Sequence, residues 1–361
     1  MIRLPLVLII LGSVLGSDFQ LLASEKDAVL WINQKKGLAL GSPTFFVSLA
    51  GKELTDAELD KLADLRSLRQ LYLDRTAVSD KAMKVISVLE ELKQLSLAST
   101  HITDDGVNAI LRLKNLQVLN VSGTKITDQS VRNIPNTSKL VSLNLAGTKV
   151  TDAGIRHLVS LPQLKSLDLG ATTVSDASFD VFSELANLEE LVLTAENLKG
   201  IGIIKLVKLK KLRLLYLGSS QLGDVGLTEL LSLRGLESLS LSGTKITARS
   251  ISKIKELHAL KELSLYGTPV DNEILAELSQ ISGLRSLDLG RTQVSNNGLK
   301  CLTKLRALRT LDLQSTQIDD AGLQVLCELG SLELLNLQRT NVTKAGIKLL
   351  QKVLPRCIVQ H

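Results

Sequence analysis

An apolar residue, in all but one case a leucine, recurs every 24 residues along most of this chain. The spacing holds over thirteen positions without an insertion or a deletion. Self-similarity at a fixed period of this length indicates a stack of equivalent structural units rather than a globule with one closed core. The recurring positions are Leu49, Leu73, Leu97, Val121, Leu145, Leu169, Leu193, Leu217, Leu241, Leu265, Leu289, Leu313 and Leu337.

The units share the consensus Leu-x-x-Leu-x-Leu-x-x-Thr-x-(Val/Ile)-(Ser/Thr)-Asp, which residues 140–152 match in full. This is the short strand-and-helix pattern of leucine-rich repeats. Leu143 and Leu145 lie two residues apart, so on a strand both point to the same face. Ser142 and Asn144 then point the other way, and that second face is predicted to meet solvent.

The second half of each unit predicts a helix. Thr151 stands where a helix N-cap is wanted, and Asp152 places a negative charge at the positive end of the helix. Ile155, Leu158 and Leu161 follow at helical spacing. We therefore expect one buried stripe and two or three helical turns in every repeat.

The composition supplies the core that such a stack needs. Hydrophobic residues make up 44% of the chain but aromatic residues only 2%, so the core is built from Leu, Ile and Val. Strands stack about 4.8 Å apart, whereas packed helices need about 10 Å, so the stack must curve. We predict an α/β fold: a right-handed leucine-rich-repeat solenoid, shaped like a horseshoe, with parallel strands on the concave face and helices on the convex face.

The two ends of the chain differ from the repeats. Residues 1–17 contain a largely apolar run after Arg3 and are predicted to be a signal peptide. The run is shorter than the roughly 20 residues that span a bilayer, so we expect an exported protein, secreted or periplasmic in the cell envelope, without a stable membrane anchor after signal removal. Residues 18–43 are predicted to form an N-terminal helical cap, with Trp31 against the open end of the stack. Residues 44–361 hold thirteen 24-residue repeats and a closing half repeat.

Side chains with catalytic or metal-binding chemistry are scattered. The four histidines occupy unrelated repeat positions, and the three cysteines form no disulfide framework. We expect no cofactor, no metal site and no enzyme activity. The net charge of +6 is mild, and the basic run at residues 199–213 falls in the convex half of one repeat, so nucleic acid is not an expected partner. We expect a monomer.

Two short motifs carry a resemblance to a known family. Gly-Thr-Lys-(Ile/Val)-Thr-Asp occurs at residues 123–128 and 147–152, and Leu-Pro-x-Cys-Ile closes the repeats at residues 354–358. Over residues 25–361 the chain resembles the secreted leucine-rich-repeat proteins of planctomycete bacteria. More distantly it is similar to the repeats of F-box adaptor proteins and of ribonuclease inhibitor, although Thr100 stands at a position where those repeats have Asn or Cys. The resemblance implies the solenoid and a role in protein recognition.

The concave face should expose mostly small polar side chains, against which a few residues stand out. Val192 and Tyr216 occupy equivalent positions on adjacent strands, about 5 Å apart, and Leu214 shares their face. Tyr266 lies two strands further on, about 12 Å away, with serines between the two tyrosines. Aromatic anchors are favoured hot spots of protein interfaces. The predicted partner-binding residues are Tyr72, Val192, Leu214, Tyr216, Tyr266, Asp288 and Asp312.

Asp288 and Asp312 form an equivalent pair on neighbouring strands. Their carboxylates are expected about 5 Å apart, a separation found in retaining glycosidases. A strand surface is open to water, however, and Arg291 and Arg339 stand near enough in sequence to neutralise both charges. The alternatives are a cation site or a solvated acidic part of the binding face.

The sequence therefore predicts an exported, non-enzymatic scaffold that binds a protein partner through its concave face. One alternative is a structural component of the cell envelope without a specific partner, favoured by the low aromatic content and the uniform polar surface. By distant resemblance alone, a further alternative is a ubiquitin-ligase-type adaptor.

Overall fold

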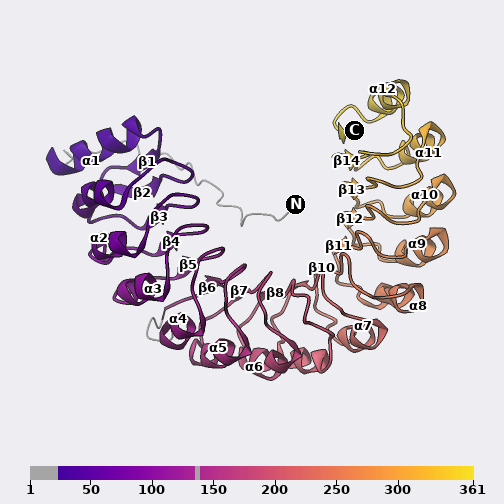
Figure 1. Ribbon diagram of the computed structural model, residues 1–361. Helices are drawn as coiled ribbons and strands as arrows, with labels where there is room; N and C mark the ends of the chain where they lie inside the picture. Colours follow the sequence, from indigo (N-terminus) through magenta and orange to yellow (C-terminus); the bar gives the residue numbers. More distant parts are fainter. Residues whose placement is uncertain (1–22, 135–138) are drawn as a thin grey trace.

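The computed structural model describes residues 23–134 and 139–361, which form one curved solenoid. Strands line the inside of the arc and helices line the outside (Figure 1). The sheet is open, and its fifteen strands follow one another in chain order. The predicted α/β solenoid is confirmed. The predicted signal peptide, residues 1–17, lies outside the described residues.

All neighbouring strands are parallel except the first pair, which forms an antiparallel hairpin. The register advances by 24 residues from strand to strand, so equivalent positions of adjacent repeats lie side by side, as with Val192 and Tyr216. The strands are β1 (Leu38–Gly41), β2 (Thr44–Ser48), β3 (Gln70–Tyr72), β4 (Gln94–Ser96), β5 (Val118–Asn120), β6 (Ser142–Asn144), β7 (Ser166–Asp168), β8 (Glu190–Val192), β9 (Leu214–Tyr216), β10 (Ser238–Ser240), β11 (Glu262–Ser264), β12 (Ser286–Asp288), β13 (Thr310–Asp312), β14 (Leu334–Asn336) and β15 (Ile358–Gln360).

The convex side carries short helices, several of them 3-10. Most α-helices span four to seven residues. The α-helices are α1 (Ala23–Gln34), α2 (Met83–Ile86), α3 (Asp104–Ile110), α4 (Asp128–Asn133), α5 (Asp152–Ile155), α6 (Phe179–Glu184), α7 (Asp224–Leu230), α8 (Ala248–Ile251), α9 (Asn272–Leu278), α10 (Asn296–Leu302), α11 (Asp320–Leu326) and α12 (Lys344–Val353). The 3-10 helices are η1 (Asp56–Asp64), η2 (Asp80–Ala82), η4 (Arg156–Ser160), η5 (Asp176–Ser178), η6 (Ile203–Lys208) and η7 (Ser252–Glu256). The four-residue α-helices continue directly from or into a 3-10 helix, as α5 does into η4.

A single hydrophobic core runs the length of the arc. From β3 to β14 the middle residue of each strand, such as Leu167 or Leu215, is buried, and so is the apolar residue that follows the strand, such as Leu169 or Leu217. Helical residues close the core from the outside, and the cluster extends without a break from the cap to Cys357. Each repeat therefore buries its apolar face only because it has neighbours.

Aspartates at the start of the convex helices link one repeat to the next. The Asp128 carboxylate accepts hydrogen bonds from the backbone N–H and the hydroxyl of Thr151, at 2.8 and 2.7 Å. Asp80 binds Thr103 in the same way. The sequence predicted only a charge at the helix end for these residues, and the link between repeats is an additional role. We call this series the aspartate ladder.

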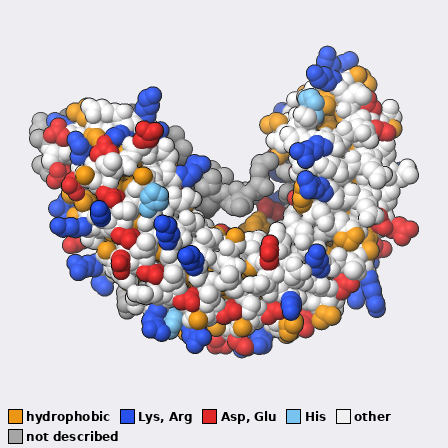
Figure 2. Space-filling view, in the orientation of Figure 1, with side chains coloured by type: hydrophobic (Ala, Val, Ile, Leu, Met, Phe, Trp, Pro, Cys, Tyr) orange, Lys and Arg blue, Asp and Glu red, His pale blue; other side chains and the backbone are white. Residues whose placement is uncertain are grey.

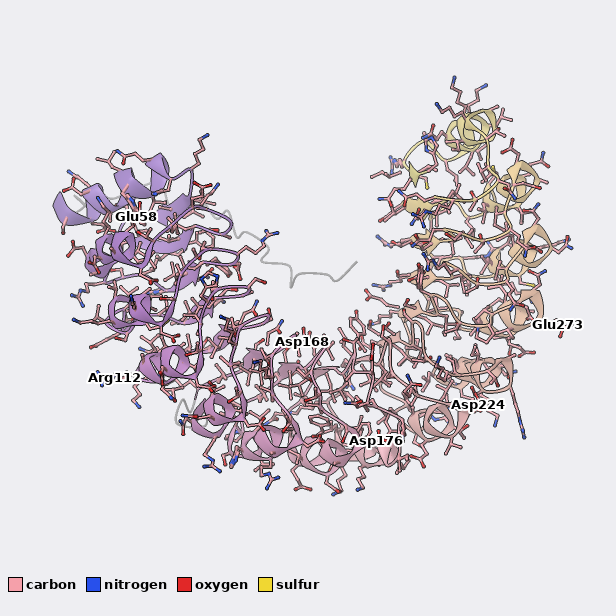
Figure 3. The ribbon with its side chains drawn as sticks, viewed as in Figure 1. Glu58, Arg112, Asp168, Asp176, Asp224 and Glu273 are labelled. Atoms are coloured by element: carbon pink, nitrogen blue, oxygen red, sulfur yellow. The ribbon has the colours of Figure 1, made fainter. Side chains whose placement is uncertain are left out.

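The aspartate ladder has two gaps. At two positions equivalent to Asp128 stand Gly200, which has no side chain, and Ala248, whose methyl group cannot accept a hydrogen bond. Asp176, the last member before the first gap, accepts from the backbone N–H groups of Lys199 and Gly200 instead of a hydroxyl. Asp176 and Asp224, on either side of this gap, lie among the outer helices in Figure 3.

The N-terminal end of the stack is closed by α1 and the β1–β2 hairpin. Trp31 on α1 is 5% exposed and belongs to the core. The buried Glu25 carboxylate accepts the backbone N–H of Thr44 at the start of β2. Lys35 forms an ion pair with Glu58 of the first repeat, at 2.5 Å. The cap is thus joined to the repeats by both apolar and polar contacts.

At the other end, α12 stops before Pro355 and β15 pairs with β14. Within the two described segments, no helix is long and apolar enough to cross a membrane.

Candidate functional site on the concave face

Three rows of side chains face the inside of the arc. The first row begins at Phe46 and ends at Ile358, the second runs from Ser48 to Gln360, and the third from Ala50 to Gln338, each in steps of 24 residues. The first and second rows belong to the strands, and the third lies just beyond them. Asp168, a member of the second row, is seen on the inner side of the arc in Figure 3.

The structure brings Val192, Leu214 and Tyr216 together as predicted. Val192 on β8 is paired in register with Tyr216 on β9, and Leu214 begins the same strand two residues earlier. All three side chains are partly exposed. The Tyr216 phenol oxygen lies 3.3 Å from Ser238 Oγ on β10, so the ring crosses toward the next strand.

Tyr266 leans in the same direction, toward β12. A Cβ atom built on Gly290 would lie 2.7 Å from Tyr266 Cδ2, so the ring rests against the bare Gly290 backbone. The guanidinium carbon of Arg291 lies 5.6 Å from the ring centroid, a cation–π contact. Tyr266 is thus held in place and still partly exposed. We call Val192, Leu214, Tyr216 and Tyr266 the apolar patch.

Three serines separate the two tyrosines of the apolar patch. Ser240 Oγ lies 3.2 Å from Ser242 Oγ, which lies 2.7 Å from Ser264 Oγ. Ser264 then donates to the Asp288 carboxylate at 2.7 Å. The floor of the patch is therefore a connected hydroxyl chain that ends on a carboxylate.

Asp288 and Asp312 are paired in register on β12 and β13, and both side chains are partly exposed. Asp288 accepts hydrogen bonds from Ser264 at 2.7 Å and from the backbone N–H of Gly290 at 3.0 Å. Burial raises the pKa of Asp288; the two hydrogen bonds oppose this shift, and the negative charge of Asp312 adds to it.

The two arginines that were predicted to neutralise this pair, Arg291 and Arg339, form no ion pair with it among the described residues. Arg291 lies over Tyr266 rather than on a carboxylate. Asp312 accepts from Gln314 and from Asn336 Nδ2, at 2.9 and 2.8 Å. Neutral donors therefore hold both carboxylates. No group of three potential metal ligands occurs in residues 23–134 and 139–361.

Tyr72 is far from the other predicted residues, on β3. Its hydroxyl donates to Gln94 Oε1 at 2.9 Å, and its ring lies 5.4 Å from that of Phe46. Burial, with the negative charge of Asp74 as a second cause, raises the pKa of Tyr72. Four strands lie between β3 and β8, so only a partner that follows the arc would contact both Tyr72 and the apolar patch.

Sequence reasoning missed the carboxylates that flank the apolar patch. Glu190 begins β8 and is exposed, and Asp168 ends β7. Burial raises the pKa of Asp168, and hydrogen bonds from Gly170 and Asn144 oppose that shift. Glu262 begins β11. The 24-residue period could have identified Glu190 and Glu262, because both belong to the first row, which is exposed like the second.

The basic run on the convex side is paired with its neighbours. Lys205 forms an ion pair with Asp180 at 2.7 Å, and Lys208 with Glu184 at 3.3 Å. Charged side chains of both signs are intermixed along the outer rim of the arc in Figure 2. The run therefore forms part of a mixed charged surface.

A second exposed apolar group was not predicted. Ile201 and Val225 stand at equivalent positions of adjacent repeats and are 70% and 77% exposed. Ile204 nearby is 39% exposed. These residues lie at the first gap of the aspartate ladder, beside η6 and α7 and away from the strands.

Comparison with known proteins agrees with this geometry. The leucine-rich-repeat family model matches residues 91–111, 112–134, 137–159, 284–302 and 304–327.

This chain contains leucine-rich repeats.

The repeats also have counterparts among solved structures. An internalin from Listeria monocytogenes is 22% identical, with a TM-score of 0.62, and the match covers 94% of each chain. A leucine-rich-repeat protein of Leptospira interrogans is 21% identical, with a TM-score of 0.49, over 83% of this chain and 92% of the other. At 22% identity the likeness to the internalin is one of fold. No curated protein matches this leucine-rich-repeat chain in sequence.

Proposed function

We propose that this chain is an exported, non-enzymatic leucine-rich-repeat scaffold that binds a protein partner through its concave face. The observation that carries the proposal is the apolar patch, because it gathers two tyrosines and two aliphatic side chains on and just beyond β8, β9 and β11. The other large apolar side chains of the three rows lie nearer the ends of the arc: Phe46, Tyr72, Val118, Leu334 and Ile358. Tyrosine supplies a large contact area with few rotatable bonds and is enriched among interface hot spots. Export rests on the signal-like residues 1–17.

The arrangement of the patch supports binding rather than chance exposure. Both tyrosine rings are held by neighbours, Tyr216 near Ser238 and Tyr266 against Gly290 and Arg291. Side chains that are already ordered lose less conformational entropy when a partner docks. Hydrogen bonds from neutral donors occupy the candidate acid pair, Asp288 and Asp312, and this favours a recognition surface over a catalytic one.

A pull-down from the cell envelope of the source organism tests the proposal. We expect the wild-type chain to retain a partner that the double variant Tyr216→Ala, Tyr266→Ala does not retain. Ile201→Ala is the matched control, because it removes an apolar side chain that is 70% exposed on the other side of the molecule. Equal retention of the partner by the double variant and the wild type would show that the apolar patch does not bind it. It would favour a structural envelope component instead.

A further inference from the structure

Charge is unevenly distributed over this molecule. The whole chain has 43 Lys and Arg against 37 Asp and Glu. Yet from Phe46 to Gln360 the three concave rows contain neither Lys nor Arg. The acidic residues in these rows are Asp74, Asp168, Glu190, Glu262, Asp288 and Asp312. The three rows therefore carry acidic but no basic side chains, and the nearest arginines, Arg75, Arg291 and Arg339, stand one residue beyond the third row, with Arg291 over the Tyr266 ring.

The acidic side chains lie on both sides of the apolar patch. Asp168 and Glu190 belong to β7 and β8, and Asp288 and Asp312 to β12 and β13. The two tyrosines lie between these strands: Tyr216 is the last residue of β9, and Tyr266 lies two residues beyond the end of β11. A segment that lies along the arc and covers the patch must therefore pass carboxylates at each end.

These four carboxylates have hydrogen-bond donors but no cationic partner. Asp168 accepts from Asn144 Nδ2 at 3.1 Å and from the backbone N–H of Gly170 at 2.9 Å. Glu190 accepts from Ser166 Oγ at 3.0 Å. No ion pair of Asp168, Glu190, Asp288 or Asp312 occurs among the residues that the structure describes. Acidic side chains elsewhere, such as Glu189 and Glu237, do have Lys partners.

We propose that the occupant of the concave face is a cationic protein segment, with apolar side chains seated on the apolar patch and Lys or Arg side chains on the flanking carboxylates. This inference rests on the proposed function and names the chemistry of its partner. An acidic segment would meet like charge at both ends of the patch, which opposes binding. A neutral segment would leave the four carboxylates without compensation.

The spacing of the strands sets the spacing of the cationic residues. Four strand intervals separate Glu190 on β8 from Asp288 on β12, which is about 19 Å at 4.8 Å per interval. An extended chain advances about 3.3 Å per residue. The two cationic positions should therefore be about six residues apart, with the apolar anchors between them.

Synthetic peptides test this chemistry directly. The probe is a fluorescein-labelled peptide of about nine residues, with Trp and Leu in its centre and two Lys at each end, so that the inner Lys residues are about six positions apart. Two companions replace the Lys residues with Gln or with Glu. We expect the Lys peptide to bind the wild-type chain more tightly than the Gln peptide by about tenfold, and the Glu peptide not to bind. Added salt should weaken the Lys peptide most.

A charge variant and a matched control locate the contact. Asp168→Asn, Glu190→Gln, Asp288→Asn and Asp312→Asn together should raise the dissociation constant of the Lys peptide about tenfold. The control removes the same number of charges at exposed positions outside the concave rows, through Glu91→Gln, Asp105→Asn, Glu273→Gln and Glu328→Gln, and should bind like the wild type. Circular dichroism of both variants checks that the fold is kept.

The outcomes separate this inference from the proposed function. If the Lys peptide does not bind, or binds the charge variant as well as the wild type, the inference is overturned. The Gln peptide could bind the wild-type chain as tightly as the Lys peptide does and bind the Tyr216→Ala, Tyr266→Ala variant more weakly. This result would support the apolar patch as the binding site and contradict a cationic partner. If the dissociation constant of the peptide is the same for the Tyr216→Ala, Tyr266→Ala variant and the wild type, the apolar patch is not the binding site.

Discussion

The carboxylate of Asp104 accepts hydrogen bonds from the backbone N–H and the hydroxyl of Thr127, one repeat further along the chain, at 2.9 and 2.7 Å. It also accepts from the backbone N–H of Ser130 at 3.2 Å and from its hydroxyl. Burial opposes ionisation, but these hydrogen bonds together hold the pKa of Asp104 below its usual range. A helix-capping charge alone would not explain this, because the donors belong to a different repeat.

Removing this member of the aspartate ladder should destabilise the solenoid. Asp104→Ala leaves the Ser130 hydroxyl, which is fully buried, and the Thr127 N–H without their partner. We expect the free energy of unfolding to fall by about 2–4 kcal/mol. Urea denaturation followed by circular dichroism measures the change. Asp105→Ala is the control, since Asp105 is exposed, and an equal loss in both variants would contradict the ladder's role.

A left-handed residue in most repeats offers a stabilising substitution. Ala171 is exposed and has φ of 54°, at a position where Gly123 and Gly147 have φ of 64° and 65°. Ala171→Gly should raise the free energy of unfolding by about 0.5–1 kcal/mol, because glycine relieves the steric cost of this conformation. Thermal denaturation checks the direction. Ala153→Gly, at an exposed position in α5, should have the opposite sign.

The stability of the contact between the N-terminal cap and the first repeat should depend on pH. The hydrogen bond from Lys35, followed by the backbone N–H of Thr55, lowers the pKa of Glu58 from 4.5 to about 2. A carboxyl whose folded pKa is depressed contributes stability that is present above the unfolded pKa and is lost as the pH falls through the folded value. Glu58→Gln should therefore be less stable than the wild type above pH 4.5, and the difference should shrink as the pH falls toward 2.

Hydrogen exchange of α1 amides at pH 7 and at pH 3 measures this local stability. The same comparison for Glu91→Gln, at an exposed position with a different environment, provides the control. A difference between Glu58→Gln and the wild type that stays constant with pH would show that the Lys35 ion pair is not its source.

The position of the Tyr266 ring should depend on the absence of a side chain at residue 290. A Cβ atom there would lie 2.7 Å from Tyr266 Cδ2 and 2.8 Å from Gln314 Cγ. Gly290→Ala should displace the ring and weaken binding of the Lys peptide by about threefold to tenfold. Gly218→Ala, at the equivalent position after β9, places its Cβ 3.3 Å from the nearest atom and should have a smaller effect. Fluorescence polarisation with the same peptide compares the two.

The 24-residue period by itself determined the architecture of this protein and the register of its sheet. The leucine at each equivalent position is buried against its counterpart in the next repeat. This places Val192 beside Tyr216, and Asp288 beside Asp312. The concave rows, and hence the membership of the apolar patch, followed from the alternation of side chains along a strand.

Only the tertiary structure decided what those side chains contact. The tilt of Tyr216 toward Ser238, the support of Tyr266 by Gly290 and Arg291, and the partial burial of Asp288 depend on neighbours that differ from one repeat to the next. The same holds for the aspartate ladder, in which a residue's partner lies 23 positions away. A period shows which positions are equivalent, but side-chain rotamers and unlike neighbours determine which donors and acceptors meet.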